Sequence, residues 1–384
     1  MPGTFEITAR DAATEARCGV LHTAHGPVET PVFMPVGTQG TVKAMDPSEL
    51  EAWNYRIILG NTFHLHERPG EDLVEELGGL HRFIGWPHAI LTDSGGFQIF
   101  SLADLRKVTD EGVAFQSPRD GSRRFIGPVE AMAIQRRLGS DIAMVLDECP
   151  PYPCTRESAC EAVRRTLKWA SLCVAQPRAS GQLVFGIVQG GAHEDLRENC
   201  AKELVQLGFD GYAIGGVSVG EPETLIRQGV EHGVRHLPPD RPRYLMGVGL
   251  IPQMAEAVAR GVDMFDCVMP TRYARNGTAI TRRGRRPVKA ARYARDERPI
   301  EEGCSCAACA RFSRAYVRHL MHAGEILGVR LLTAHNLHCY AEFIREARQA
   351  IQAQAYGDFV ERVRREYRPR ADDPEDPAEP GDAE

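Results

Sequence analysis

Residues 183–221 read LVFGIVQGGAHEDLRENCAKELVQLGFDGYAIGGVSVGE, and they contain two apolar runs that each end in glycine and polar residues. Near-continuous hydrophobicity, without strict alternation, is typical of strands that are covered on both faces of a parallel sheet. Residues 194–207, between the two runs, show a weaker apolar spacing of the kind found in amphipathic helices. This stretch therefore predicts a strand, a helix and a second strand parallel to the first.

Six further apolar runs of the same kind occur along the chain. They lie at residues 31–38, 56–62, 89–96, 141–148, 244–249 and 263–270. Eight such strands, alternating with helices, predict a (β/α)8 barrel whose functional groups lie at the carboxyl ends of the strands. An open doubly wound sheet has the same alternation. However, the chain lacks G-x-G-x-x-G after its first strand and lacks G-x-x-x-x-G-K-[ST], which disfavours the nucleotide-binding versions of these folds.

Helices are predicted between the strands, most clearly at 156–176 and more weakly at 253–260. The apolar stripe of the first helix consists of Cys160, Val163, Leu167, Ala170 and Val174. Near the carboxyl terminus a further helix is predicted through Leu337, Ala341, Ile344 and Ala347.

The 384-residue chain is 43% hydrophobic and 26% charged, a composition that excludes global disorder. Its sequence has no secretory signal pattern and no apolar run long enough to span a membrane, so we expect a cytoplasmic protein with no membrane partner. The 11 cysteines are scattered and odd in number, which does not fit a secreted disulfide framework. Reduced thiols and a metal site are expected instead.

The cysteines Cys304, Cys306 and Cys309 form a C-x-C-x2-C motif, and His335 lies farther along the chain. Three thiolates and one imidazole form the closed tetrahedral ligand set of a structural zinc site. With no position open to water, such a metal stabilises the fold and does not catalyse. Spacing alone leaves the fourth ligand open. The alternatives to His335 are His319, His322, His338 and Cys339.

Charge is distributed unevenly along the chain. Residues 371–384 hold seven acids, three prolines and no base, so we predict a disordered acidic tail, without which the net charge changes from -6 to +1. Residues 272–298 hold ten Arg or Lys against Asp296 and Glu297, which indicates an anionic partner such as a nucleic acid, with a solvated basic face as the alternative.

These features divide the chain into four predicted parts. They are a barrel with the catalytic mouth at 1–270, an inserted basic zinc-binding subdomain at 271–340, a helical part that packs on the barrel at 341–370, and the tail at 371–384.

Three predicted strands end in an acid: Asp93, Asp147 and Asp266. Burying an aspartate is costly unless the carboxylate is partnered or used in chemistry, and in a barrel all three would converge on one mouth. Carboxylates of this kind can divide acid, base and nucleophile roles in the cleavage of a glycosidic bond. The alternative is that each aspartate caps the helix that follows it.

Residues suited to a flat heterocycle lie near these acids. Gln189 offers a donor and an acceptor together, and Gly215 and Gly216 allow backbone groups to approach a ligand. Phe97 and Met246 can stack on the two faces of an aromatic base, although on pattern alone each is more often a core residue. A base in a nucleic acid is therefore the predicted substrate.

The sequence resembles the tRNA-guanine transglycosylases, also called queuine tRNA-ribosyltransferases, over residues from about 5 to 370. The resemblance rests on FMPVGTQGTVK (33–43), GNTFHL (60–65), DSGGFQ (93–98), LDECPP (146–151), GIVQGG (186–191), IGGVSVGE (214–221), MGVG (246–249), FDCVMPTRYARNG (265–277) and the cysteine motif with its distant histidine. So many separated motifs in one order are highly specific. The resemblance implies a (β/α)8 barrel with an inserted zinc-binding subdomain.

The reaction that the resemblance implies is base exchange at the wobble position of tRNAs with GUN anticodons, for aspartate, asparagine, histidine and tyrosine. Guanine-34 is replaced by 7-aminomethyl-7-deazaguanine, preQ1, during queuosine biosynthesis. Asp266 is implied as the nucleophile that carries the ribose in a covalent intermediate, and Asp93 as the general acid and base. The partners implied are the tRNA anticodon loop, a 7-deazaguanine base and a second copy of the chain in a homodimer.

Further residue roles follow from the same resemblance. Base binding is implied for Phe97, Asp147, Gln189, Gly216 and Met246, with Glu221 supporting the backbone near Gly216. Contacts with tRNA phosphates are implied for Arg272 and Arg275. One Zn²⁺ is implied at Cys304, Cys306, Cys309 and His335.

Cys149 and Val219 predict a base pocket too tight for queuine, which favours preQ1 and the bacterial type of the family; the acidic tail argues against the archaeal type. The chain departs from the family pattern at Leu250–Gln253, where a phosphate contact is in doubt, and at Tyr273. Competing hypotheses are a non-catalytic RNA-binding subunit of the same fold, a retaining glycoside hydrolase, and a relative that exchanges bases in DNA.

Overall fold

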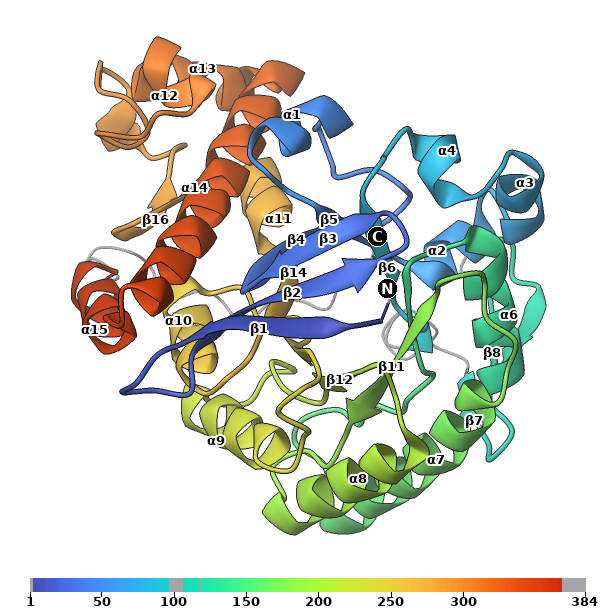
Figure 1. Cartoon of the computed structure of the whole chain (residues 1–384). Helices are drawn as coiled ribbons and strands as arrows, with labels where there is room; N and C mark the ends of the chain where they lie inside the picture. The colour runs from blue at the N-terminus through green and yellow to red at the C-terminus, as the bar shows by residue number, and fades with distance from the viewer. Residues whose placement is uncertain (1–2, 97–105, 118, 368–384) are drawn as a thin grey trace.

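The computed structural model describes residues 3–96, 106–117 and 119–367. Its centre is a closed barrel of eight parallel strands, seen in Figure 1. In chain order the strands are β4 (Val32–Gly37), β5 (Ile57–Gly60), β6 (Ala89–Thr92), β10 (Ile142–Met144), β11 (Leu183–Val188), β12 (Gly211–Ile214), β13 (Arg243–Leu245) and β14 (Met264–Cys267). Each strand overlaps one of the eight predicted apolar runs, so the (β/α)8 prediction is confirmed.

The barrel strands are buried along their length, as their near-continuous hydrophobicity predicts. One face of the strands fills the barrel, and the other packs against the surrounding helices. Close packing is visible at Gly211, where a Cβ atom would lie 2.4 Å from the ring of Phe185 on the neighbouring strand. Any larger residue at this position would displace the phenylalanine ring.

Helices surround the barrel in the order in which they follow the strands (Figure 1). They are α1 (Pro47–Ala52), α2 (Thr62–Glu67), α3 (Glu71–Glu76), α4 (Leu80–Ile84), α6 (Pro128–Leu138), α7 (Arg156–Val174), α8 (Glu194–Leu207), α9 (Glu223–Val234) and α10 (Ile251–Ala259). The helices expected at 156–176, 194–207 and 253–260 are therefore present as α7, α8 and α10.

The predicted buried stripe of α7 is wrong in part. Val163 and Ala170 are buried, but Cys160 is exposed, and Leu167 and Val174 are half-buried. The buried face is centred on the large ring of Trp169 and includes Ala159, Ala162, Thr166 and Cys173. The apolar periodicity predicted the helix correctly, but it did not show that the barrel covers the side of α7 on which Trp169 lies.

An antiparallel sheet that the sequence did not predict lies at the amino ends of the barrel strands. It consists of β1 (Phe5–Arg10), β2 (Arg17–Thr23) and β3 (Gly26–Thr30). Arg17 in β2 forms a buried ion pair with Asp263, the residue before β14, with Nη2 at 2.6 Å from Oδ2. The sheet thus closes the end of the barrel opposite the mouth.

A second unpredicted sheet interrupts the chain between β6 and α6. It contains β7 (Arg106–Val108), β8 (Val113–Gln116) and β9 (Arg123–Ile126). Residues 97–105 before it, which include Phe97, lie outside the described residues, as does the predicted tail at 371–384.

After β14 the chain leaves the barrel alternation, as predicted. It forms α11 (Met269–Asn276), the hairpin β15 (Thr278–Thr281) and β16 (Gly284–Pro287), the 3-10 helix η1 (Ala291–Tyr293), α12 (Ala307–Arg311), α13 (Arg314–Ala323), α14 (Ile326–Gln352) and α15 (Tyr356–Glu366). A small second hydrophobic core extends from Ala274 to Leu332, whereas the side chains from Leu337 onward belong to the barrel core.

The helix α14 joins these two cores and lies along α11 in Figure 1. The boundary predicted at 340/341 falls inside α14. The predicted subdomain at 271–340 and the predicted helical part at 341–370 are therefore joined by one continuous helix. In the described ranges, no helix is both long and apolar enough to cross a membrane.

Candidate active site and metal centre

The carboxyl ends of the barrel strands carry the three predicted acids. Asp93 follows β6, Asp147 lies beyond the end of β10, and Asp266 lies within β14. Because the strands are parallel, their carboxyl ends meet at one mouth. The other predicted base-site residues follow the neighbouring strands at the same rim: Gln189, Gly215, Gly216 and Met246.

Asp93 is buried and accepts hydrogen bonds from the loop after β5. Asn61 Nδ2 donates to Oδ2 at 2.5 Å, and the Thr62 N–H donates to Oδ1 at 2.8 Å. Burial raises the pKa of Asp93 to about 6; the donors of Thr62 and Asn61 oppose this rise, and the negative charge of Asp266 adds to it. A carboxyl group with this pKa can both donate and accept a proton near neutral pH.

Asp147 is held by the amide of Gln189. Gln189 Nε2 donates to Asp147 Oδ2 at 2.6 Å, and Ser94 Oγ donates to Oδ1 at 3.5 Å. Burial raises the pKa of Asp147 to about 6, although the hydrogen bonds from Gln189 and Ser94 lower it. Because the amide nitrogen of Gln189 faces the carboxylate, its oxygen Oε1 is buried and has no hydrogen-bond partner among the described residues. Such an acceptor is suited to receive a donor from a ligand.

Asp266 is half-buried, and its two carboxylate oxygens are in different environments. Oδ1 accepts from the Tyr244 hydroxyl at 2.5 Å and from the Gly247 N–H at 2.8 Å. No described residue donates a hydrogen bond to Oδ2. Burial raises the pKa of Asp266, and the hydrogen bonds from Tyr244 and Gly247 oppose the rise. Within the described residues, Oδ2 is therefore the carboxylate oxygen left without a donor.

The mouth thus combines a carboxylate with one unbound oxygen and two buried carboxyl groups whose pKa values are about 6. This arrangement can divide nucleophile and acid–base roles among different carboxyl groups. Asp93 accepts its two shortest hydrogen bonds from Asn61 and Thr62, earlier in the chain, and a longer one from the Gly95 N–H at 3.2 Å, so its carboxylate does more than cap the chain that follows.

The loop after β12 borders the same mouth. Glu221 accepts hydrogen bonds from the N–H groups of Ser218, at 2.5 Å, and Val219, at 2.8 Å. It therefore holds the backbone just beyond Gly216, whereas Arg197 holds Gly216 itself through its carbonyl oxygen. Met246, after β13, is half-buried and packs against the barrel core.

The cluster of Cys304, Cys306, Cys309 and His335 has the geometry of a metal centre. The three Sγ atoms lie 3.6, 3.6 and 3.4 Å from His335 Nδ1. Zinc–sulfur and zinc–nitrogen bonds at tetrahedral angles require a separation of about 3.6 Å. These four residues can hold one metal ion.

The other proposed fourth ligands are not part of the cluster. His338 lies one turn after His335 on α14 and pairs with Ser305, with Nε2 at 3.2 Å from Oγ. The cluster joins the loop before α12 to α14. A metal there fastens the small second core to the long helix.

A second group of possible ligands, His25, His81 and Asp141, lies at the opposite end of the barrel. The two imidazole rings stack with centroids 3.5 Å apart. Rings that bind one zinc ion tetrahedrally diverge from it, which puts their centroids about 5 Å apart. Both rings instead bind the carboxylate of Asp141, which fastens the β2–β3 turn and α4 to the start of β10.

Comparison with known proteins assigns the family. A sequence model described as Queuine tRNA-ribosyltransferase matches residues 11–369. The chain belongs to this family. A queuine tRNA-ribosyltransferase of Pelotomaculum thermopropionicum is 55% identical over 367 residues, which cover 96% of this chain and 99% of the relative. The resemblance found in the sequence is therefore confirmed, and so is its implication of a transferase enzyme.

Other relatives have the same name and similar coverage. The queuine tRNA-ribosyltransferase of Moorella thermoacetica is 53% identical over 94% of this chain and 97% of its own length. That of Staphylococcus aureus is 51% identical over 95% of this chain and 96% of its own length. The similarity to the family thus extends over both the barrel and the subdomain.

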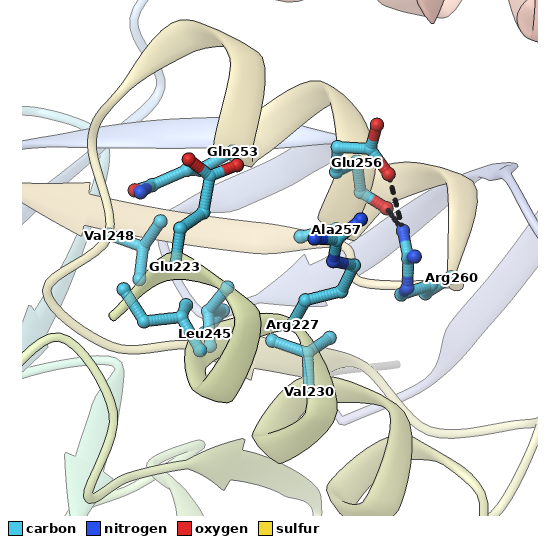
Figure 2. A pocket seen from close by; sticks show the side chains of 10 residues that line it. Glu223, Arg227, Val230, Leu245, Val248, Gln253, Glu256, Ala257 and Arg260 are labelled. Carbon is cyan, nitrogen blue, oxygen red and sulfur yellow. Dashed lines mark hydrogen bonds and ion pairs between the residues drawn. The ribbon is translucent and has the colours of Figure 1, made fainter. Parts of the chain in front are cut away.

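The departure from the family pattern at Leu250–Gln253 lies where α10 begins. Figure 2 shows Gln253 beside Glu223 in a small hollow between α9 and α10, with the ion pair of Glu256 and Arg260 at its other end. Leu245 from β13 also lines this hollow. Its neighbour Tyr244 instead contacts Asp266. Both carboxylates, Glu223 and Glu256, and two guanidinium groups, Arg227 and Arg260, line this hollow.

The family-implied arginines Arg272 and Arg275 lie on α11, which begins just after β14. Arg272 is half-buried, and Arg275 is exposed. Tyr273, the other departure, accepts a hydrogen bond from Arg285 at 3.1 Å, so it joins α11 to β16.

Several functional residues were missed by sequence reasoning. Asn61, Thr62 and Ser94 contact the acids Asp93 and Asp147, and Tyr244 contacts Asp266. Asn61 and Ser94 lie at the carboxyl ends of the predicted runs 56–62 and 89–96, so the rule that functional groups lie at strand ends gave a signal for them. Tyr244 lies inside an apolar run, where a tyrosine is indistinguishable from a core residue.

Proposed function

We propose that this protein is a tRNA-guanine transglycosylase that replaces guanine-34 of tRNAs with GUN anticodons by preQ1, in queuosine biosynthesis. The observation that carries the proposal is the pairing of Asp266, whose Oδ2 has no donor among the described residues, with Asp93, whose pKa is about 6. Family membership supports a tRNA substrate.

In the proposed first half-reaction, Asp266 Oδ2 attacks C1′ of the ribose. The bond from C1′ to N9 of guanine breaks, and an ester bond from C1′ to the carboxylate forms. Asp93, protonated, gives its proton to the departing guanine. The hydrogen bonds from Tyr244 and Gly247 fix Oδ1, so that Oδ2 faces the reacting carbon.

In the second half-reaction the ring nitrogen of the incoming base attacks C1′. Asp93 takes the proton from this nitrogen, and the Asp266 carboxylate leaves. Two displacements at one carbon retain its configuration and conserve the glycosidic bond energy, so no ATP is needed. A base stacked in the pocket keeps water from the ester.

Base recognition is proposed for Asp147, Gln189 and the backbone at Gly216. The buried, unpartnered Oε1 of Gln189 is a suitable acceptor for N–H groups of a guanine-like base. Met246 is proposed to stack on one face of the base. Phe97, proposed for the other face, lies outside the described residues.

The anticodon loop is the proposed site of tRNA binding, because its bases are unpaired and can turn into a pocket at low cost. Arg272 and Arg275 are proposed to contact its phosphates, helped by the basic stretch at 272–298. The half-buried Cys149 and Val219 favour preQ1 over the larger queuine.

We further propose that the metal is one Zn²⁺, because three thiolates and one imidazole suit zinc. The ion would supply tetrahedral bonds that hold the subdomain together. A cytoplasmic, homodimeric enzyme is proposed as well.

The proposed function is tested by incubating the protein with tRNA that carries radiolabelled guanine-34 and adding preQ1, queuine or 7-cyano-7-deazaguanine, preQ0, in turn. Release of label with preQ1 at the lowest concentration is expected. Retention of label with every base would contradict base exchange.

A further inference from the structure

Arg197, on the first turn of α8, has no exposed surface, and no carboxylate of the described residues pairs with it. Burial lowers the pKa of its guanidinium to about 10, which leaves it cationic at neutral pH. A buried charge without a counterion is costly, so the protein must satisfy it with other polar groups.

Three glycines make room for the Arg197 side chain. A Cβ at Gly190 would lie 2.8 Å from its Cγ, and one at Gly229 on α9 would lie 3.4 Å from its Nη2. A Cβ at Gly216 would lie 3.7 Å from the same nitrogen. The side chain therefore lies between the loop after β11, the loop after β12 and α9.

Three of the five N–H groups of Arg197 donate to backbone carbonyl oxygens of these two loops. Nε donates to Gly191 O at 2.6 Å, Nη1 to Gly215 O at 3.1 Å, and Nη2 to Gly216 O at 2.9 Å. The rigid guanidinium thus fixes two consecutive peptide planes, those that join Gly215 to Gly216 and Gly216 to Val217.

In a trans peptide the N–H points away from the carbonyl of the same plane. Since both carbonyls face Arg197, the N–H groups of Gly216 and Val217 face away from it. The Gly216 N–H contacts the thiol of Cys149, near Asp147 at the barrel mouth. Glu221 uses the next two N–H groups, those of Ser218 and Val219.

Within the described chain, the Val217 N–H therefore has no acceptor, and the Gly216 N–H has only the weakly accepting thiol of Cys149, which a stronger oxygen acceptor can replace. Gly216 lies at φ +61°, a left-handed conformation that helps turn consecutive N–H groups toward one side. These two N–H donors lie beside Gln189, whose Oε1 is an acceptor with no partner among the described residues. Together the three groups form a polar edge that can bind both acceptors and donors of a ligand.

We infer that Arg197 is a positioning residue that sets the specificity of the base site: by holding the carbonyls of Gly215 and Gly216, it presents backbone donors to the oxygen at position 6 of a 6-oxopurine. This inference rests on the proposed function. It adds a structural reason why the site would select a base with an oxo group. Arg197 acts through these carbonyls, to which three of its N–H groups donate, and not through its own contact with the base.

The test compares guanine with 2-aminopurine, which is guanine without the 6-oxo group. The KM of labelled guanine for incorporation into tRNA and the inhibition constant of 2-aminopurine are measured for the wild type, Arg197→Gln and Arg197→Lys. We expect the KM of guanine to rise roughly tenfold in Arg197→Gln, the loss of one well-formed hydrogen bond. The constant of 2-aminopurine should change less than about twofold, because it has no oxygen for the donors to bind.

Arg243 provides a matched control. It too is buried and donates to backbone carbonyls, with Nη2 at 3.1 Å from Leu237 O, and burial lowers its pKa to about 10. It lies at the start of β13, at the end of the barrel opposite the mouth. Arg243→Gln should lower the melting temperature and leave both base constants unchanged.

Gly229→Ala provides a variant that keeps the guanidinium. Its new Cβ would lie 2.8 Å from Val217 Cγ1, which pushes the loop while adding a residue that helices favour. It should shift the guanine KM in the same direction by a smaller factor, so the inference stays testable even where Arg197→Gln does not fold.

Two results would show that Arg197 has only a structural role. One is an equal loss of affinity for guanine and for 2-aminopurine; the other is an unchanged guanine KM in a folded Arg197 or Gly229 variant. If instead the wild type fails to incorporate guanine into tRNA, the proposed function itself is wrong. The two failures are therefore distinguishable.

Discussion

Three carboxyl groups, the buried Asp93 and Asp147 and the half-buried Asp266, carry the proposed chemistry of the mouth at the scale of single residues. Each has a pKa raised first by burial, but their hydrogen-bond donors differ. Asp93 is bound by Asn61 and Thr62. Asp147 is bound by the Gln189 amide and the Ser94 hydroxyl, and within the described part of the chain Asp266 is bound through Oδ1 alone. The surroundings of each carboxyl group therefore suit it to a different task.

Tyr244→Phe tests the role of the hydroxyl that holds Asp266 Oδ1 at 2.5 Å. Without this hydroxyl the carboxylate can rotate, and in the proposed reaction Oδ2 would no longer be directed at the ribose. We expect kcat to fall roughly 10- to 100-fold, since a lost charge-assisted hydrogen bond costs about 1.5–3 kcal/mol. The KM of tRNA should stay the same in steady-state guanine exchange. A KM increase with unchanged kcat would assign Tyr244 to binding instead.

Asp147→Asn tests the cost of a buried charge. The folded-state pKa of Asp147 is raised to about 6, so its ionised form destabilises the fold at higher pH. The variant should be more stable than the wild type at pH 8, by about 1–3 kcal/mol, and the difference should vanish as the pH falls from about 6 to 4. Urea unfolding at several pH values measures this, while guanine exchange should be lost.

Asp110→Asn is the control with the opposite sign. Asp110 is bound by Arg164, whose hydrogen bonds lower its pKa to about 2, so its ionised form stabilises the fold above its unfolded pKa. This variant should not gain stability at pH 8. A gain in both variants would mean that removal of any negative charge is stabilising.

At the scale of elements, the metal cluster connects the loop before α12 to α14. Elemental analysis should find one zinc per chain, and Cys306→Ser should lose the metal and lower the melting temperature. Cys160→Ser, which changes an exposed cysteine outside the cluster, should do neither. Full zinc content in Cys306→Ser would exclude this site.

The N-terminal sheet is fastened to the barrel by Asp141, which precedes β10. Its carboxylate accepts from His25, His81 and the Ile90 N–H, each at 2.9 Å. Burial raises the pKa of Asp141, but these hydrogen bonds outweigh it, so the net shift is downward. Its stabilising effect is therefore present above its unfolded pKa and is lost as pH falls through the folded value.

Asp141→Ala should destabilise the fold by about 2–4 kcal/mol, because several buried donors lose their acceptor. Denaturant unfolding measures this change, and the guanine KM should stay the same because the site lies opposite the mouth. Asp195→Ala, which removes an exposed partner of Arg156, serves as the control and should have a small effect. A large change in the guanine KM of Asp141→Ala would contradict this purely structural role.

For the whole molecule, the sequence predicted the barrel because buried parallel strands need apolar residues on both faces. The runs at 183–191 and 211–221 carried this signal directly. The sheet β1–β3 was not predicted. Its link to the barrel depends on Arg17 and Asp263, which are 246 positions apart and show no local pattern.

The candidate site, like the fold, was predictable only in part. Acids at strand ends were found because burying a charge is costly, and the cysteine spacing gave the metal cluster. The hydrogen bonds of Tyr244 and Arg197 were not predictable, because a tyrosine in an apolar run and an arginine on a helix have ordinary structural roles. Only the closed barrel brings them to the mouth.

The most direct test of the central claim, that Asp266 carries the ribose, is to trap the reaction. The protein is incubated with tRNA and a guanine analogue that has carbon at position 9 and cannot rejoin the ribose. Denaturing electrophoresis and peptide mass spectrometry then locate any protein-linked RNA. The account predicts one adduct, on the peptide containing Asp266, and none with Asp266→Asn. An adduct on another residue, or no adduct from a protein that still exchanges guanine, would contradict it.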